Sequence, residues 1–278
     1  MRLQGVRDDY TSAENAEHGG IPMTDCEILK NINNGAVFYL NVFGNAEHMQ
    51  IEDHGNFRYI YPKGDGQGVR LVYDIRLENL SVENAQAKIA EIKAMNVPVW
   101  WPVHISNTLY RLIHNKNREP VSLTPPDGIE LYMAATSPTQ IPAIQPIDGV
   151  KIQKSDDENS FALWARSVKD CFHDDFQYFH PQYHYPACKS GEMRCYLCRK
   201  NDRPVAVCSI MDNEGICSLE NVATHMDYRR QGIAKYLCAV AMKEAFVCGA
   251  KLISLRAVEP GTRELYTSLG YRTYNHAV

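Results

Sequence analysis

The apolar residues of the C-terminal half change their spacing in a regular way, which predicts alternating strands and helices. Phe161 and Trp164 belong to a set at helical spacing that follows a β-rich run at 150–153. Ser155 and Glu158 form a capping box, which predicts the start of this helix. Beyond it, clusters of Asn, Asp and Gly separate the apolar runs, as turns do between strands. The expected strands are 193–199, 204–211, 216–223, 252–258 and 271–276, and the expected helices are 232–247 and 261–269.

The N-terminal half repeats much of this order. A helix at 25–43, interrupted at Asn33–Gly35, is expected to precede strands at 49–51, 57–61 and 69–75. The remaining elements are a helix at 84–95 capped by Ser81, a short buried strand at 97–101, a helix at 106–114 and a strand at 128–135.

A proline-rich segment divides the two halves. It contains three prolines within nine residues, which disfavours both a helix and a central strand. The sequence therefore predicts two α/β domains, 1–140 and 141–278, each with a twisted mixed sheet flanked by helices.

Composition narrows the classes of function. The chain has 278 residues, a formal net charge of -4 and 22% charged residues, so no basic surplus indicates a nucleic-acid partner. No apolar run approaches the ~20 residues of a membrane span. The polar N-terminal segment lacks the apolar stretch of a secretory signal, and a cytoplasmic location is expected. The nine cysteines are scattered, which favours reduced core thiols over disulfides. No metal site is expected, because Cys195 and Cys198 on one strand would face opposite sides.

One segment has the features of an anion site. A predicted strand is followed by a turn and then by a helix that opens with Arg229-x-x-Gly232-x-Ala234. The first turn of a helix exposes amide donors and the positive end of the helix dipole. Gly232 and Ala234 have little or no side chain, so a diphosphate can approach the backbone, and Arg229 and Arg230 add positive charge.

A second motif follows at Leu265-Tyr-Thr-Ser-Leu-Gly-Tyr271. In this order and spacing, the two motifs resemble those of the GNAT superfamily of N-acetyltransferases. The resemblance implies that the turn amides hold the pyrophosphate of acetyl-CoA and that the preceding strand pairs with its pantetheine arm. The implied cofactor-binding residues are Asn221, Val222, Ala223, Thr224, Arg229, Arg230, Gln231, Gly232, Ile233 and Ala234.

The resemblance also implies catalytic roles. Tyr266 would protonate the departing thiolate, although such a tyrosine can also simply pack on the sheet. Glu220 is the candidate base, on the strand that leads to the turn. Strand alternation puts Glu220 on the face opposite Leu219 and Asn221. It reaches the amine if that face lines the cleft, and is an exposed charge otherwise.

The chain departs from the family pattern in two places. The segment Glu259-Pro-Gly-Thr-Arg263 lacks the asparagine that family members usually carry one turn before the tyrosine that corresponds to Tyr266. Only one strand fits after Gly270, where the family has two, so the second is expected from another segment, such as the N-terminal half, or not at all. The N-terminal half resembles a degenerate copy, because Asp74–Ser81 has acidic residues and no glycine where the phosphate turn should be. No acetyl-CoA is expected there.

The acceptor side is less defined. Asp174, Asp175, Tyr178 and Tyr183 suit a cationic amine through charge and cation–π contacts, and an ordinary surface loop is the alternative. The predicted function is acetyl transfer from acetyl-CoA to a small-molecule amine by a monomer or homodimer. A protein or peptide acetyltransferase and an inactive acyl-CoA-binding sensor or scaffold are the alternatives.

Overall fold

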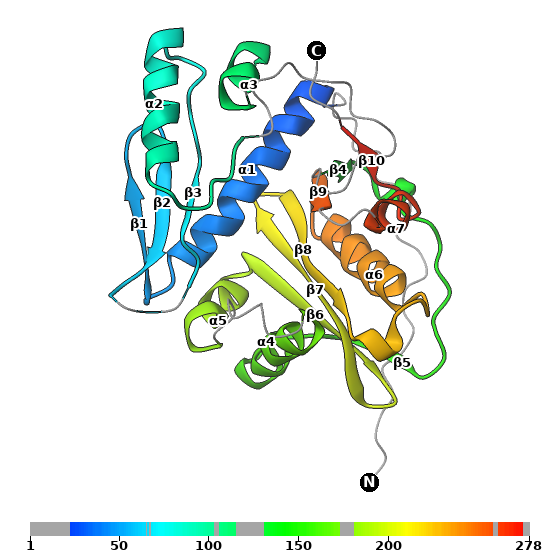
Figure 1. Ribbon diagram of the computed structural model, residues 1–278. Helices are drawn as coiled ribbons and strands as arrows, with labels where there is room; N and C mark the ends of the chain where they lie inside the picture. Colours follow the sequence, from blue (N-terminus) through cyan, green and yellow to red (C-terminus); the bar gives the residue numbers. More distant parts are fainter. Residues whose placement is uncertain are drawn as a thin grey trace.

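A long helix separates two β-sheets in the computed structural model, which describes residues 23–64, 66, 68–102, 106–114, 131–172, 181–257 and 261–274 (Figure 1). This helix, α1 (Asp25–Gly44), begins at a capping box between Thr24 and Glu27. The smaller sheet is antiparallel and consists of β1 (Met49–Asp53), β2 (Arg58–Pro62) and β3 (Leu71–Tyr73). Helices α2 (Val82–Ala94) and α3 (Asn107–His114) pack on the smaller sheet through a shared apolar cluster.

The larger sheet has seven strands in the order β10-β4-β9-β8-β7-β6-β5. Its neighbours are antiparallel except for β8 and β9, which are parallel. The strands are β4 (Leu131–Ala135), β5 (Val150–Lys154), β6 (Met193–Lys200), β7 (Arg203–Asn213), β8 (Ile216–Thr224), β9 (Leu252–Ala257) and β10 (Arg272–Thr273).

Helices cover both faces of the larger sheet, as strand alternation requires (Figure 1). Cys208 of β7 lies in the cluster beneath α6 (Ile233–Val247) and α7 (Thr262–Thr267), whereas Val207 lies in the cluster beneath α1, α4 (Glu158–Phe172) and α5 (Pro181–Ser190). Cys195 and Cys198 of β6 lie in these opposite clusters, as predicted. None of the helices in the described residues is both long and apolar enough to cross a membrane.

Strand β4 comes from the N-terminal half of the sequence yet lies inside the larger sheet. It pairs antiparallel with β9 on one side, with Leu131 opposite Ala257, and with β10 on the other, with Ala134 opposite Arg272. The prediction that another segment supplies the strand missing after Gly270 is therefore confirmed. The strand we expected to complete the N-terminal domain instead completes the C-terminal sheet, although the division at 140/141 itself stays a prediction.

Two expected helix boundaries were wrong. Helix α1 continues through Asn33–Gly35, because buried Gly35 packs against Ser254 of β9 and Ser218 of β8. Helix α4 is capped by Asp157, whose carboxylate accepts from the amides of residues 159 and 160. Ser155 is buried, and its amide instead donates to the carbonyl of Cys195 at 2.8 Å.

Two further segments also differ from expectation. The strand predicted at 97–101 is reduced to an isolated parallel bridge between Val99 and Val72. No helix is predicted between the helix that starts near Glu158 and the strand at 193–199, whereas Pro181–Ser190 form α5. Pro186 lies within this ten-residue helix. A proline inside a helix removes a backbone hydrogen bond, so the sequence alone argues against a helix here.

Candidate functional site

The parallel pair β8 and β9 separates partway along its length. Among the described residues, its pairing covers Ile216–Ser218 and Leu252–Ser254, although β8 continues to Thr224 and β9 to Ala257. Residues 219–224 therefore pair with β7 on one side and not with β9 on the other. Such an edge offers backbone donors and acceptors to an extended ligand, as in strand addition.

Asn221 makes β8 irregular at this point. Three steps along β8, from Ala223 to Glu220, match two along β7, so β8 carries a bulge. Asn221 has a φ of 56°, and its side-chain amide donates to Ser209 Oγ at 2.8 Å. Tyr39 of α1 donates to Asn221 Oδ1 at 3.3 Å.

The bulge alters the predicted alternation. Glu220 stands opposite Ser209, and Asn221 bonds to the same serine, so both lie toward the face covered by α1 and α4. The expectation that Asn221 shares the face of Leu219 was wrong because of this extra residue. Glu220 does oppose Leu219, which is buried beneath α6.

The segment after β8 forms a turn that leads into α6. A short 3₁₀ turn at Met226–Tyr228 is followed by Arg229, whose Nε donates to the carbonyl of Thr224 at 3.0 Å. Arg230 and Gly232 have φ values of 61° and 77°. Gly232 occupies the N-cap position of α6 and offers no side-chain cap to the first-turn amides. Those amides and the helix dipole therefore suit an anion.

Among the described residues, the space in front of Gly232 is open. A Cβ atom at Gly232 would meet only Ile147 Cδ1 of that part of the chain within 4 Å, at 3.8 Å. The positive φ of Gly232 favours glycine, since an L-residue there costs roughly 1–2 kcal/mol. Gly232 thus gives the turn both its shape and its exposed backbone, which fits a bound diphosphate.

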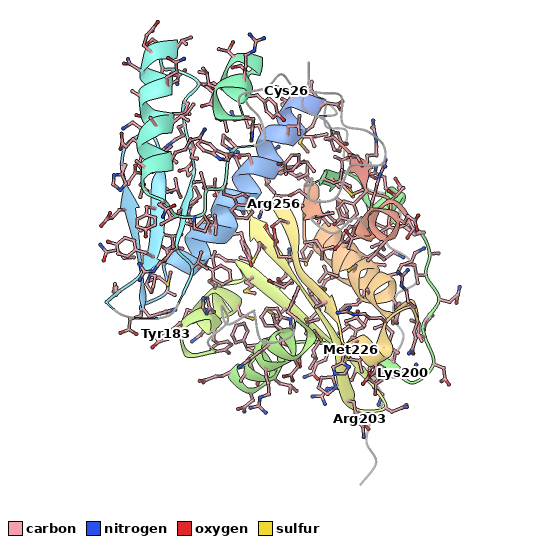
Figure 2. All side chains as sticks on the ribbon, in the orientation of Figure 1. Cys26, Tyr183, Lys200, Arg203, Met226 and Arg256 are labelled. Atoms are coloured by element: carbon pink, nitrogen blue, oxygen red, sulfur yellow. The ribbon has the colours of Figure 1, made fainter. Side chains whose placement is uncertain are left out.

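Lys200 joins this turn from the end of β6, a contact that the sequence did not predict. Its Nζ donates to Gln231 Oε1 at 2.6 Å. Figure 2 shows Lys200 and Met226 at the same end of the sheet, near Arg203. Lys200 adds positive charge near Arg229 and Arg230. Lys200 and Gln231 are 31 residues apart in the sequence, so no local pattern predicts that they lie close together.

Tyr266 lies in α7 and is 8% exposed. Its ring makes an edge contact with that of Tyr271, with centroids 5.9 Å apart. Burial raises the pKa of Tyr271 well above its usual value, and the negative charge of Glu220 contributes in the same direction. Tyr266 of α7 therefore contacts a buried tyrosine whose pKa is also raised by the charge of Glu220 on β8.

Gly270 explains the Leu-Gly step of the second motif. It has a φ of 91°, and a Cβ atom there would lie 2.1 Å from the carbonyl oxygen of Gln140. The amides of Leu269 and Tyr271 both donate to the carbonyl of Tyr266, at 3.0 and 3.1 Å. This close approach fixes α7 and Tyr266 against the segment that follows β4.

The predicted acceptor residues are only partly described. Asp174, Asp175 and Tyr178 lie outside the described residues. Tyr183 lies on α5, where its ring stacks on that of His48 with centroids 4.2 Å apart. Within the described ranges, no group of three or more His, Cys, Asp and Glu residues could hold a metal ion.

Comparisons with known proteins agree with this arrangement. Residues 161–271 match the family model of the Acetyltransferase (GNAT) family. A GCN5-related N-acetyltransferase from Kribbella flavida is 17% identical, with a TM-score of 0.58 over 86% of this chain and 91% of that one. Another from Sphaerobacter thermophilus is 16% identical, with a TM-score of 0.55 over 80% and 79%. No curated protein matches the chain. At these identities, the structural likeness concerns the fold.

Proposed function

We propose that this chain is an acyltransferase that transfers an acetyl group from acetyl-CoA to a primary amine of a small molecule. The match of residues 161–271 to the GNAT acetyltransferase family supports this proposal. Members of this family generally use acetyl-CoA. The observation that carries the proposal is the separation of β8 from β9 beside the uncapped first turn of α6. Together, these two features suit a ligand with an extended amide arm and a diphosphate.

The residues around the gap between β8 and β9 would have the following roles. The pantetheine arm pairs with the backbone of Asn221–Thr224, and the pyrophosphate lies against the amides from Arg229 to Ala234. The amine nitrogen attacks the thioester carbon, forming the C–N bond while the C–S bond breaks. Glu220 accepts the proton lost by the amine, and Tyr266 donates its proton to the thiolate. The buried position of Tyr266 beside Tyr271 supports this role, because it excludes water from the leaving group.

Thiol release from acetyl-CoA tests the proposal with a panel of polyamines, amino acids, amino sugars and lysine peptides. We expect amine-dependent release with at least one small amine and formation of the matching amide, detected by mass spectrometry. Turnover of peptides alone would favour the protein acetyltransferase. Acetyl-CoA binding without turnover of any amine would indicate the sensor or scaffold.

A further inference from the structure

A chain of hydrogen bonds runs from helix α1 to the strand that carries the proposed base. Tyr39 Oη donates to Asn221 Oδ1 at 3.3 Å, between residues that are 182 positions apart in the sequence. Asn221 Nδ2 donates to Ser209 Oγ at 2.8 Å. Ser209 Oγ in turn donates to the backbone carbonyl of Glu220 at 3.4 Å. The chain therefore begins in the N-terminal half of the sequence and ends at the residue proposed as the base.

The middle of this chain is buried. Ser209 is completely buried, and Asn221 is 8% exposed. Hydrogen bonds in such surroundings are stronger than in water, and a buried amide that loses its partner destabilises the structure. Asn221 uses its amide N–H on Ser209 and its amide oxygen on Tyr39. The orientation of the Asn221 side chain is therefore fixed from two sides.

The same chain holds an unusual stretch of backbone. Asn221 lies in the bulge of β8 with a φ of 56°, a conformation that persists only where the surrounding structure holds it. Tyr39 and Ser209 contact Asn221 from two different elements, α1 and β7. A bulge changes the direction in which neighbouring side chains point. The direction of the Glu220 side chain thus depends on how firmly Asn221 is held.

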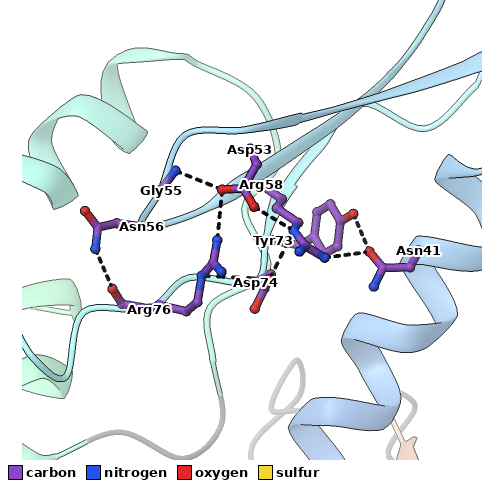
Figure 3. Close-up of polar contacts among 8 residues, drawn as sticks. All are labelled: Asn41, Asp53, Gly55, Asn56, Arg58, Tyr73, Asp74 and Arg76. Atoms are coloured by element: carbon purple, nitrogen blue, oxygen red, sulfur yellow. Dashed lines mark hydrogen bonds and ion pairs between the residues drawn. The ribbon is translucent and has the colours of Figure 1, made fainter. Parts of the chain in front are cut away.

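Helix α1 is itself fixed on another side. Asn41 follows Tyr39 by two residues, a spacing that places the two side chains on different faces of the helix. Asn41 Oδ1 accepts from Tyr73 Oη of β3 at 2.8 Å and from Arg58 of β2 at 3.3 Å (Figure 3). Arg58 also forms an ion pair with Asp53, at 3.2 Å. Tyr39 thus projects from a helix that the smaller sheet holds in place.

We propose that Tyr39 is a positioning residue for acyl transfer, which acts through Asn221 and Ser209 to orient Glu220. This inference rests on the proposed function, in which Glu220 accepts the proton of the amine. A proton acceptor must lie within hydrogen-bond reach of that amine, so a small displacement of Glu220 lowers the rate of transfer rather than the affinity for acetyl-CoA. The N-terminal half of the chain thereby contributes to catalysis through α1.

Two variants of the full chain separate this role from a general effect on folding. Tyr39→Phe removes the hydroxyl that donates to Asn221. Tyr73→Phe is the matched control, because it also removes a bond between a tyrosine and an asparagine that involves α1, but on the side of the smaller sheet. Asn41 still accepts from Arg58 in this control, so α1 keeps a polar contact with that sheet.

Hydrogen exchange, followed by mass spectrometry, measures how firmly residues 219–224 are held. We expect Tyr39→Phe to raise the exchange rate of this segment about 5-fold or more, the effect of one lost hydrogen bond. Tyr73→Phe should leave the exchange of the segment unchanged. No change in Tyr39→Phe, or the same change in both variants, would overturn the proposal. This measurement requires no amine and therefore does not depend on the acceptor.

A double-mutant cycle then shows whether Tyr39 acts through Glu220. Tyr39→Phe should lower kcat about 10-fold or more with little change in affinity for acetyl-CoA, and Tyr73→Phe should retain kcat. In the Glu220→Gln background, Tyr39→Phe should change kcat less than about 2-fold, because the base that it orients is absent.

The outcomes distinguish this proposal from the proposed function. Turnover by the wild type with an unchanged kcat in Tyr39→Phe, or an equal loss in both backgrounds, would overturn the positioning role alone. Raised exchange in Tyr39→Phe, without turnover of any amine by the wild type, would overturn the proposed function and confine Tyr39 to holding β8.

Discussion

Asn221 shows how a single residue shapes the site. Its positive φ and its bond to Ser209 stabilise a bulge at the position where β8 leaves β9. Few non-glycine residues accept this conformation, and asparagine is one of them. Tyr39 contacts the same side chain from α1, so a residue of the N-terminal half supports the backbone beside which the acetyl group would lie.

The hydroxyl of Tyr266 is predicted to matter for turnover, and that of Tyr271 is not. Tyr266→Phe removes the proposed proton donor, and we expect kcat to fall about 10²–10⁴-fold with little change in affinity for acetyl-CoA. Tyr271 is a matched control, because its buried Oη has no hydrogen-bond partner within the described residues. Tyr271→Phe should leave kcat and stability close to wild type. Equal losses of kcat in both variants would contradict the role of Tyr266.

The proposed base predicts a pH-dependent defect. Glu220→Gln keeps the size of the side chain but cannot accept the proton of the amine, so kcat/KM should fall about 10²–10⁴-fold near neutral pH. The defect should shrink as the pH rises, because a growing share of the amine is already deprotonated. Rate profiles of both proteins against pH measure this. A defect of constant size across the range would argue that Glu220 only positions other groups.

At the scale of elements, the position of α7 depends on the close approach of Gly270 to the carbonyl of Gln140, which leaves no room for a side chain. Gly270→Ala would put a methyl group on the carbonyl of Gln140 in a left-handed conformation. We expect a loss of about 2–4 kcal/mol in the free energy of unfolding, measured with urea. Gly261→Ala, at the other end of α7, is the control, since a Cβ atom there meets no described residue within 4 Å. Similar stabilities of the two variants would contradict this contact.

The sequence could predict those elements whose signals are local. Turn residues between apolar runs placed β6, β7 and β8 within a few residues of their observed bounds, and the Arg-x-x-Gly-x-Ala motif placed the start of α6. The bulge at Asn221 and the proximity of Lys200 to Gln231 depend on register between strands. Pairing of that kind joins distant residues and has no local signal, so it could not be predicted.

At the scale of the whole molecule, the two halves of the sequence share one large sheet. Strand β4 separates β9 from β10, and Ile28, Leu29 and Ile32 of α1 form one apolar cluster with Leu252 of β9. The N-terminal half therefore contributes a strand and a covering helix to the fold of the other half. The Pro-rich segment predicted a boundary because proline interrupts local structure, whereas the position of β4 depends on long-range pairing.

This sharing predicts that the C-terminal half cannot fold alone. A fragment of residues 141–278 lacks both β4 and α1, which leaves β9 unpaired on one side and its apolar face uncovered. We expect such a fragment to show no cooperative thermal unfolding and to expose apolar surface, in contrast to the full chain. A melting transition like that of the full chain would show that the two halves are independent.

Calorimetric titration with acetyl-CoA tests most directly whether the turn before α6 holds the diphosphate. We compare wild type with Gly232→Glu and Gly249→Glu. Both glycines have positive φ and, in the part of the chain that the structure describes, space for a Cβ atom, but they lie at opposite ends of α6. We predict one site per chain for wild type and Gly249→Glu, and affinity at least about 100-fold weaker for Gly232→Glu, whose carboxylate would repel the phosphates. Equal binding by wild type and Gly232→Glu, or no binding by wild type, would contradict the account.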